Sequence, residues 1–519
     1  MSKTTSQHSF PAACPTGRWT LAATIIASSM AFIDSTALNV ILPSLQSDLG
    51  ANASDLFWVL NSYLLMLAAL IIVGGSLGDS LGRVRVFQVG IIIFTIGSLL
   101  CGFSQDITQL IIFRTLQGIG GAFMIPGSLA IISATFSKEE KGKAIGTWSS
   151  VTTIVTICGP VLGGALAGIG LWRLIFFINI PLGIAALLVS QWKVPESKDP
   201  NATRVDWLGA ILLAVSLMAL NFGFLEMPEW TFWHPYVFAS ISVGVVLFFV
   251  FLWVESTRPW AMVPLRLFRN RAFSGINLLS FFLYAALGGV MLFLSLNLIQ
   301  IQGFTELQAG LTFLPFSLLM VVVAPIAGRL TDRYGARNFL VVGPTLTGIG
   351  FLMLANVGMT GGPGDYWTTF FPGFMVFALG MSITVVPLTT GVMSAVGDNQ
   401  SGVASGVNNS VTRLANSFMN ALLGVLAISL FLSYVSGRAA ELDLTGAQVL
   451  MVLEEGRKLG EATAPEGLSQ ADQTEISVIY RDGFINVYRL VALFSASLAF
   501  LSAIIAVFTV RTKRSDPAG

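Results

Sequence analysis

Long, nearly uninterrupted blocks of apolar residues dominate this chain and constrain its fold more than any other feature. A helix needs about 20 mostly apolar residues to cross the roughly 30 Å hydrocarbon core of a bilayer. Because lipid offers no partner for backbone polar groups, a crossing segment must be a helix or a strand of a closed barrel. Blocks that are long and continuous, rather than short and alternating, indicate helices. The sequence therefore predicts an all-α integral membrane protein.

Fourteen such blocks are present, which predicts fourteen transmembrane helices. They lie at 19–43, 56–78, 86–104, 107–132, 145–169, 172–192, 205–226, 234–254, 275–299, 309–332, 338–357, 367–395, 405–434 and 484–510. Lysine and arginine residues predict the orientation, because cytoplasmic loops carry an excess of both. With a cytoplasmic N-terminus, 20 of the 28 basic residues fall in cytoplasmic segments. We therefore expect both termini in the cytoplasm.

Composition excludes several classes of protein. Charged residues make up only 11% of the chain and the net charge is +1, whereas a soluble protein carries about 25% charged residues. This excludes a soluble enzyme and leaves no basic surface for nucleic acid. The chain lacks the phosphate-binding loop of ATPases, and its two histidines, His8 and His234, lie in a tail and a loop. We expect no metal, no cofactor and no enzymatic reaction.

Two predicted cytoplasmic loops repeat one pattern at an interval of 253 residues. The first reads Gly75-Ser-Leu-Gly-Asp79-Ser-Leu-Gly82-Arg83, and the second reads Gly328-Arg-Leu-Thr-Asp332-Arg-Tyr-Gly335-Ala-Arg337. Repeated halves with a binding site between them at the membrane midplane are typical of secondary transporters. The sequence thus predicts two related six-helix bundles.

The predicted organisation assigns every part of the chain. The six-helix bundles occupy 19–192 and 275–510, and an inserted helix pair with its linkers occupies 193–274. Cytoplasmic tails occupy 1–18 and 511–519, and one long extracytoplasmic loop lies at 435–483, inside the second bundle.

The repeated loops resemble motif A of the major facilitator superfamily, and three further stretches narrow this resemblance. The fourth block carries residues that resemble motif B, namely Leu110, Arg114, Gln117, Gly118 and Gly121. The fifth block carries residues that resemble the antiporter motif C, namely Gly159, Pro160, Gly163 and Gly164. The first block carries residues that resemble a first-span motif, namely Asp34, Thr36, Asn39 and Pro43. This set is similar to the fourteen-span proton:drug antiporters of the EmrB/QacA type. The resemblance implies the major facilitator fold and multidrug efflux from the cell (inner) membrane, driven by the proton gradient.

Asp34 and Arg114 are the candidate residues for proton coupling. Asp34 lies in the middle of an apolar block, where an acid is costly and indicates function. Burial favours the protonated carboxyl group, so Asp34 is a group that can gain and lose a proton near neutral pH. A fixed cation such as Arg114 would help to release that proton, and the resemblance to motif B implies the same role. The alternative for Asp34 is a neutral, hydrogen-bonded structural carboxyl group or an acid paired to a neighbour in helix packing. The alternative for Arg114 is a purely structural partner of an ion or a carbonyl group.

Six polar residues inside the blocks are candidates for lining a cavity or binding substrate. They are Thr36, Asn39, Asn61, Gln117, Asn409 and Arg413. Gln117 lies one turn from Arg114 and shares its helix face. The resemblance implies glycines at the positions of Asn416 and Asn420, so this chain departs from the family pattern there.

The repeated loops and the fifth block are candidates for gating. Gly75, Asp79, Gly82 and Arg83, together with Asp332, Gly335 and Arg337, would latch the two bundles when the cytoplasmic side is closed; the alternative is positive-inside anchoring alone. Proline at 160 removes a backbone hydrogen bond, and the glycines at 159, 163 and 164 permit close helix approach. The resemblance implies an antiporter gate there, and the alternative is a kinked packing helix.

The long loop at 435–483 is the only sizeable extramembrane segment predicted. Its apolar residues from Val449 to Leu459 recur near helical spacing, and Ser469 is a candidate cap for a second helix. The loop is a candidate docking site for a periplasmic adaptor protein, and the alternative is that it caps the exit.

The function predicted from the sequence is proton-coupled export of small amphipathic compounds by alternating access. Asp34 is the only carboxylate well inside the bundles, so we expect neutral, anionic or monocationic substrates rather than dications. The alternatives are a proton-coupled importer or exporter of one metabolite on the same fold, and a membrane sensor that transports nothing.

Overall fold

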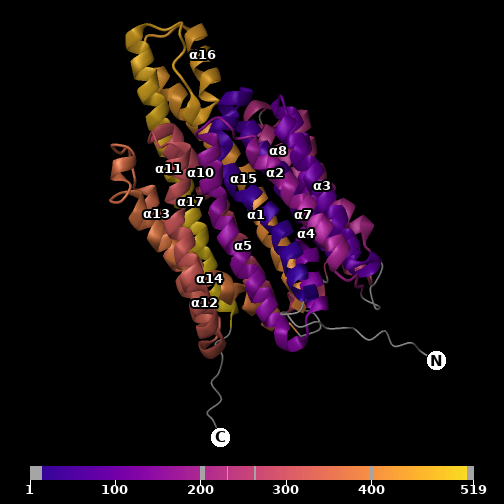
Figure 1. Cartoon of the computed structure of the whole chain (residues 1–519). Helices are drawn as coiled ribbons and strands as arrows, with labels where there is room; N and C mark the ends of the chain where they lie inside the picture. The colour runs from indigo at the N-terminus through magenta and orange to yellow at the C-terminus, as the bar shows by residue number, and fades with distance from the viewer. Residues whose placement is uncertain are drawn as a thin grey trace, which may run out of the picture.

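The computed structural model describes residues 15–198, 205–230, 232–261, 263, 265–396 and 401–510. Within these ranges, fourteen helical stretches are long and apolar enough to cross a membrane, which confirms the predicted number of spans. The helices run along one long axis and form an elongated bundle (Figure 1). The predicted tail at 511–519 and most of the tail at 1–18 lie outside the described residues.

The first bundle contains the first six spans. Its helices are α1 (Pro15–Leu49), α2 (Ala53–Leu81), α3 (Arg83–Phe103), α4 (Ile107–Thr135), α5 (Lys138–Ala167), and the pair α6 (Leu174–Phe177) and α7 (Asn179–Lys193), which form one span. Asn52 caps α2 through a reciprocal pair of hydrogen bonds with Asp55, an arrangement that satisfies free N–H groups at a helix start. α1 begins at Pro15, the first residue that the structure describes.

The second bundle contains the last six spans. It comprises α10 (Arg271–Leu296) continued by the π-helical η2 (Asn297–Ile301), α11 (Glu306–Thr312) with α12 (Leu314–Tyr334), α13 (Arg337–Ala355), α14 (Phe370–Ser394), α15 (Ser401–Ala439) and α17 (Gln470–Thr509); η1 (Leu265–Arg269) and η3 (Pro363–Asp365) are short 3-10 turns outside the spans. α10 begins at Arg271, inside the segment 193–274 that the sequence assigns to the inserted pair and its linkers.

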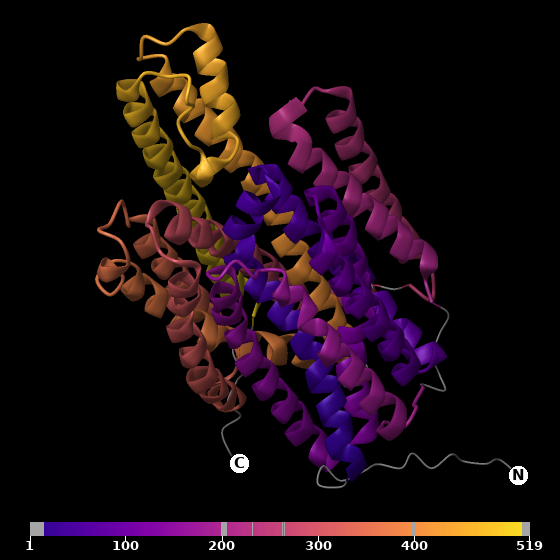
Figure 2. The ribbon, with the colours of Figure 1, turned by 45° about the horizontal axis from the view of Figure 1, so that its top comes forward.

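The inserted pair consists of α8 (Trp207–Trp230) and α9 (Pro235–Thr257). These helices pack against each other, and α8 also packs against α2 and α15, so the pair sits beside the line where the two bundles meet. Figure 2 shows the pair in magenta at the edge of the molecule. Side chains such as Phe249 and Trp253 on α9 are exposed, as expected for a helix that faces lipid.

The predicted loop at 435–483 is shorter in the structure and largely helical. It contains α16 (Gly446–Gly456) and η5 (Leu459–Glu461), while α15 extends to Ala439 and α17 begins at Gln470. Ser469 accepts a hydrogen bond from the Asp472 backbone N–H and caps α17, which confirms the predicted cap. The segment 435–483 thus includes the end of α15 and the start of α17, which continue as helices beyond the apolar blocks.

The two ends of the molecule differ. α16 projects from one end, here called the α16 end, and α1 begins and α17 ends at the other, here called the termini end (Figures 1 and 2). The α16 end is closed by hydrogen bonds between the bundles. Ser44 donates to Glu306 over 3.0 Å, Gln300 donates to Gln46 over 3.0 Å, and Gln46 donates to the Lys458 carbonyl over 3.2 Å.

Candidate functional site

The most buried charges in the first bundle form one ion pair. The Arg114 guanidinium on α4 donates to Asp34 Oδ2 on α1, and each side chain is at most 1% exposed. Both helices place these residues well away from their ends. The structure thus brings together the two residues predicted for proton coupling, although their role stays a prediction.

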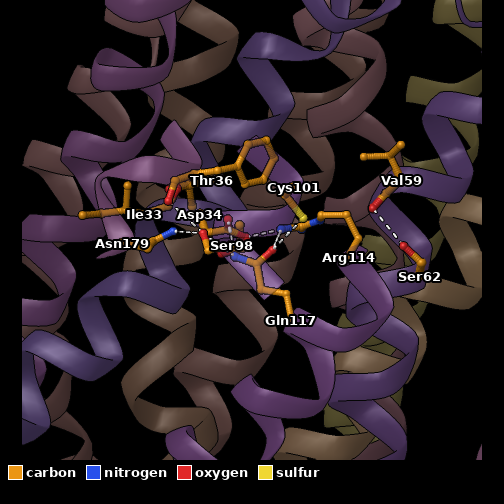
Figure 3. A network of polar contacts seen from close by, with 12 residues as sticks. Ile33, Asp34, Thr36, Val59, Ser62, Ser98, Cys101, Arg114, Gln117 and Asn179 are labelled. Carbon is orange, nitrogen blue, oxygen red and sulfur yellow. Dashed lines mark hydrogen bonds and ion pairs between the residues drawn. The ribbon is translucent and has the colours of Figure 1, made fainter. Parts of the chain in front are cut away.

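Gln117 completes the cluster by binding both partners. Its Oε1 accepts from Arg114 over 2.6 Å, and its Nε2 donates to Asp34 Oδ1 over 2.9 Å and to Ser98 over 3.2 Å. Ser98 Oγ in turn accepts from Asn179 Nδ2 over 2.9 Å. Figure 3 shows these side chains converging from four helices, α1, α3, α4 and α7.

Aromatic rings surround the Arg114 side chain. Its guanidinium carbon lies 4.4 Å from the centre of the Tyr63 ring and 5.9 Å from that of Phe176, distances at which a ring face attracts a cation. Arg114 Nε has no hydrogen-bond partner among the described residues. The guanidinium is therefore held by Asp34, Gln117 and the rings.

This cluster links the charge of one carboxyl group to the position of several side chains. Protonation of Asp34 would remove the negative charge that Arg114 and Gln117 bind, and a buried guanidinium without a counter-charge is costly. The hydrogen bonds that Arg114 and Gln117 donate to Asp34 thus depend on the charge of its carboxyl group.

The other predicted cavity residues are not part of this cluster. Thr36 donates to Phe32 O over 2.8 Å and to Thr156 O on α5 over 3.2 Å, and Asn39 donates weakly to Ser35 O over 3.5 Å. Asn61, Asn409 and Arg413 lie on α2 and α15, along the contact between the two bundles.

The motif C glycines lie in very close contact with neighbouring helices. A Cβ at Gly163 would lie 2.8 Å from the Ala37 carbonyl oxygen, and one at Gly159 would collide with the Thr36 hydroxyl. A Cβ at Gly164 would collide with the Glu306 backbone, and one at Gly310 with the Pro160 carbonyl. These glycines allow α5 to touch α1 on one face and α11 of the other bundle on another.

The motif A residues form pairs within their own bundle. Arg83 binds Asp79 over 2.8 Å, and Glu196, after α7, accepts from the backbone N–H groups of Val84 and Arg85. Gly82 and Gly335 have φ values of 122° and 81°, which confirms the predicted turns. Gly75 lies in α2 close to Pro126. Arg337 donates to the Val507 carbonyl over 3.0 Å, and the Asp332 side chain lies outside the described part of the structure.

Sequence reasoning missed several members of the Asp34 cluster. Ser98, Asn179 and Tyr63 contact it directly or through Gln117. Each is a neutral residue in an apolar span, so composition and spacing give no signal that they meet. Only the register of α2, α3 and α7 against α1 and α4 reveals them.

Comparison with known proteins identifies the class. The sequence model of one protein family, the Major Facilitator Superfamily, matches residues 24–420 of the chain. The chain therefore belongs to this superfamily of membrane transporters. Its fourteen spans and its relatives fit the fourteen-span drug-resistance group. The fold and family are those of a multi-pass transporter and not of an enzyme.

Individual relatives carry names of resistance proteins. The chain is 30% identical over 505 residues to the Tetracenomycin C resistance and export protein of Streptomyces glaucescens, covering 96% of this chain and 93% of that one. It is 33% identical over 409 residues to the Multidrug resistance protein Stp of Mycobacterium tuberculosis, covering 78% and 75%.

Solved structures share the fold at low identity. A bacterial homologue of the human lysosomal transporter Spinster, inward-facing and occupied, has a TM-score of 0.64 at 16% identity and covers 95% of this chain and 98% of that one. The inward-open xylose transporter XylE of E. coli has a TM-score of 0.59 at 13% identity, with 96% and 98% covered.

Proposed function

We propose that this chain is a proton-coupled antiporter that exports small amphipathic compounds across the cytoplasmic membrane, with both termini in the cytoplasm. The buried Asp34–Arg114–Gln117 cluster carries the proposal, because it joins a protonatable group to side chains from four spans. The names of the relatives, which include multidrug resistance and export proteins, support efflux as the direction.

The proposed cycle alternates proton binding with substrate binding. With the α16 end closed, cargo enters from the termini end while Asp34 is protonated or exchanges its proton. For this exchange to balance, Asp34 releases its proton at the termini end as cargo binds there. Rocking of the two bundles then opens the α16 end, where protons are more abundant in a respiring cell, and Asp34 takes up a proton as cargo leaves. The empty, protonated protein then rocks back. No cofactor is required, because the proton gradient supplies the free energy.

The gating role proposed for motif A rests on its position at the termini end. While the α16 end is closed, the loop charges at the termini end pair within the first bundle. They would exchange these partners for residues of the second bundle when the α16 end opens. Motif C has the corresponding gating role at the α16 end in this proposal, because Gly164 and Gly310 bring the two bundles into contact there.

Two proposals concern the segment around α16. Its contacts with its own protein, Ala53 N–H to Arg457 O at 3.3 Å and Gln46 to Lys458 O, support a role in capping the exit. Leu450 and Met451 are exposed on α16 and supply an apolar surface for the adaptor that the sequence suggests.

A drug-susceptibility screen tests the proposed function. Cells that express the wild-type chain should resist several amphipathic compounds, and cells that express Asp34→Asn at the same level should be as sensitive as cells without the transporter. Equal resistance from both proteins would contradict proton coupling through Asp34.

A further inference from the structure

One face of α15 carries a row of polar residues. Asn409, Arg413, Asn416 and Asn420 are spaced by four, three and four residues, so they share a helix face. At 1.5 Å per residue the row extends about 16 Å along the helix axis. Because α15 packs against α2 of the first bundle and α10 of the second, this row runs along the contact between the bundles.

Contacts between α15 and α10 show which residues of the second bundle lie beside the row. Asn408 donates to Asn277 and Ser280, at 3.1 and 2.8 Å, and a Cβ at Gly288 would lie 2.5 Å from Asn416 Oδ1 and 3.0 Å from Asn420 Oδ1. These contacts show that α10 and α15 run parallel. Between them, Arg413 lies near Tyr284 on α10.

Contacts between α15 and α2 show which residues of the first bundle lie beside the row. A Cβ at Gly424 would lie 2.9 Å from the Phe57 ring. α2 and α15 run in opposite directions, so Asn61, one turn after Phe57, lies level with Asn420, one turn before Gly424. Arg413 also lies near Tyr63, whose ring contacts Arg114 of the Asp34 cluster.

Several of these polar groups have no partner among the described residues. Asn61 is fully buried with both amide atoms unpartnered, and Asn420, 4% exposed, has an unpartnered Oδ1. Arg413 beside them is half-buried and has no hydrogen-bond or ion-pair partner among the described residues. Leaving buried polar groups unpaired is costly, and such groups in a native fold need a reason. Binding of a polar ligand is a reason that fits the location these groups share.

The charge at this location is positive. Asp34 is already bound by Arg114, while α10 and α15 contain no aspartate or glutamate and α2 carries them only near its ends, at Asp55 and Asp79. Among the described residues of these three helices, Arg413 therefore has no carboxylate to balance it. A guanidinium with flanking amides and phenol groups binds oxygen anions well, because it offers several N–H donors in one plane.

We propose that Asn61, Arg413, Asn416 and Asn420 form a substrate subsite for organic anions rich in oxygen acceptors, such as phenolates, enolates and carboxylates. This inference rests on the proposed function and narrows it, since it names the substrate class. The anion binds Arg413, and neighbouring carbonyl or hydroxyl groups of the substrate bind the asparagines. Tyr63 then lies between the bound anion and the Asp34 cluster.

Binding to the purified full-length protein tests the proposal without any proton gradient. The probe is 2-hydroxy-1,4-naphthoquinone, an enolate at neutral pH, compared by calorimetric titration with its uncharged 2-methoxy analogue and with the cation ethidium. The wild-type protein should bind the enolate about tenfold or more tightly than the methoxy analogue, as expected for a charge-assisted hydrogen bond. Equal binding of the three probes, or no binding of the enolate, would overturn the proposal.

Matched variants locate the subsite. Arg413→Gln should weaken enolate binding about tenfold or more, Arg413→Lys should retain most of it, and Asn420→Ala should weaken it less than Arg413→Gln. The control Arg489→Gln removes the same charge from α17, where Arg489 binds the Ala355 carbonyl, and should bind normally. Unchanged affinity in both Arg413→Gln and Asn420→Ala would overturn the subsite. Because no gradient is present, failure of proton coupling would leave these results unaffected.

Discussion

At the scale of single residues, the Asp34 cluster combines two properties that a purely structural pair does not need together. Its charges are almost fully buried, and its hydrogen bonds reach two further helices, α3 and α7, through Gln117 and Ser98. Because the pair is buried, a change in the protonation state of Asp34 has a large effect on its energy. The hydrogen bonds transmit this effect to the other helices of the bundle. Stability and transport can therefore be separated by mutation.

Arg114→Leu should destabilise the protein by about 3–5 kcal/mol, because it leaves a buried carboxylate without its partner. The double variant Asp34→Asn with Arg114→Leu removes both charges and should recover most of this stability. Thermal unfolding of the detergent-solubilised protein measures the effect. The double variant should still fail to transport; recovered transport would show that the pair is only structural.

Individual residues also show what sequence could and could not predict. Asp34 and Arg114 were predicted because a charge in an apolar block is conspicuous. Ser98, Asn179 and Tyr63 were not, because neutral residues in a span carry no such signal. The fourteen spans and the glycine turns at 82 and 335 follow from the chain alone, whereas the contacts between bundles depend on helix register, which periodicity does not determine.

At the scale of helices, the closed α16 end depends on close contact between α5 and α11. The contact is possible because Gly164 and Gly310 face each other's helix backbone with no side chain between them. Motif C is thus a packing surface whose disruption should favour the open state of this end.

Gly164→Ala should push α5 away from α11, at a cost of about 1–3 kcal/mol to the closed arrangement. The control Gly146→Ala adds the same methyl group to α5 at a position where a Cβ meets nothing within 4 Å. Labelling of a Ser44→Cys variant, with the native cysteines replaced, reports opening of the α16 end. Faster labelling is expected with Gly164→Ala only; equal rates in both backgrounds would refute this view of motif C.

The segment after α16 should respond to pH through Glu461. This residue lines a cavity of about 580 Å³ at the α16 end together with Asp48 and Glu306, and burial raises the pKa of Glu461 above its ordinary 4.5 despite the nearby Lys458. The closed segment therefore binds the proton more tightly than an open one. Its extra stability is complete below about pH 4.5 and is lost as the pH rises through the raised pKa.

Hydrogen exchange of the amides at 457–462 measures this effect. Protection, corrected for intrinsic exchange rates, should fall between pH 4.5 and 7.5 in the wild type and stay nearly constant in Glu461→Gln. The control Glu466→Gln changes an exposed carboxylate of the same segment and should behave like the wild type. A pH response that survives Glu461→Gln would contradict this assignment.

At the scale of the whole molecule, transport requires the two bundles to separate at the α16 end. The side chains of Ser44 and Glu306 meet across this end at 3.0 Å. With Ser44→Cys and Glu306→Cys in a chain without its native cysteines, a short cleavable thiol cross-linker should stop transport. Reductive cleavage should restore it, and neither single variant should respond. Transport that continues in the cross-linked protein would exclude rocking of the bundles.

The central claim is that export is coupled to proton movement through Asp34. Purified protein in sealed vesicles, loaded with a pH-sensitive dye and given an exported compound, measures it directly. The account predicts a substrate-dependent change of internal pH with the wild type and none with Asp34→Asn, although the variant folds and still binds the compound. Substrate movement without any pH change, or an unchanged pH signal in Asp34→Asn, would contradict it.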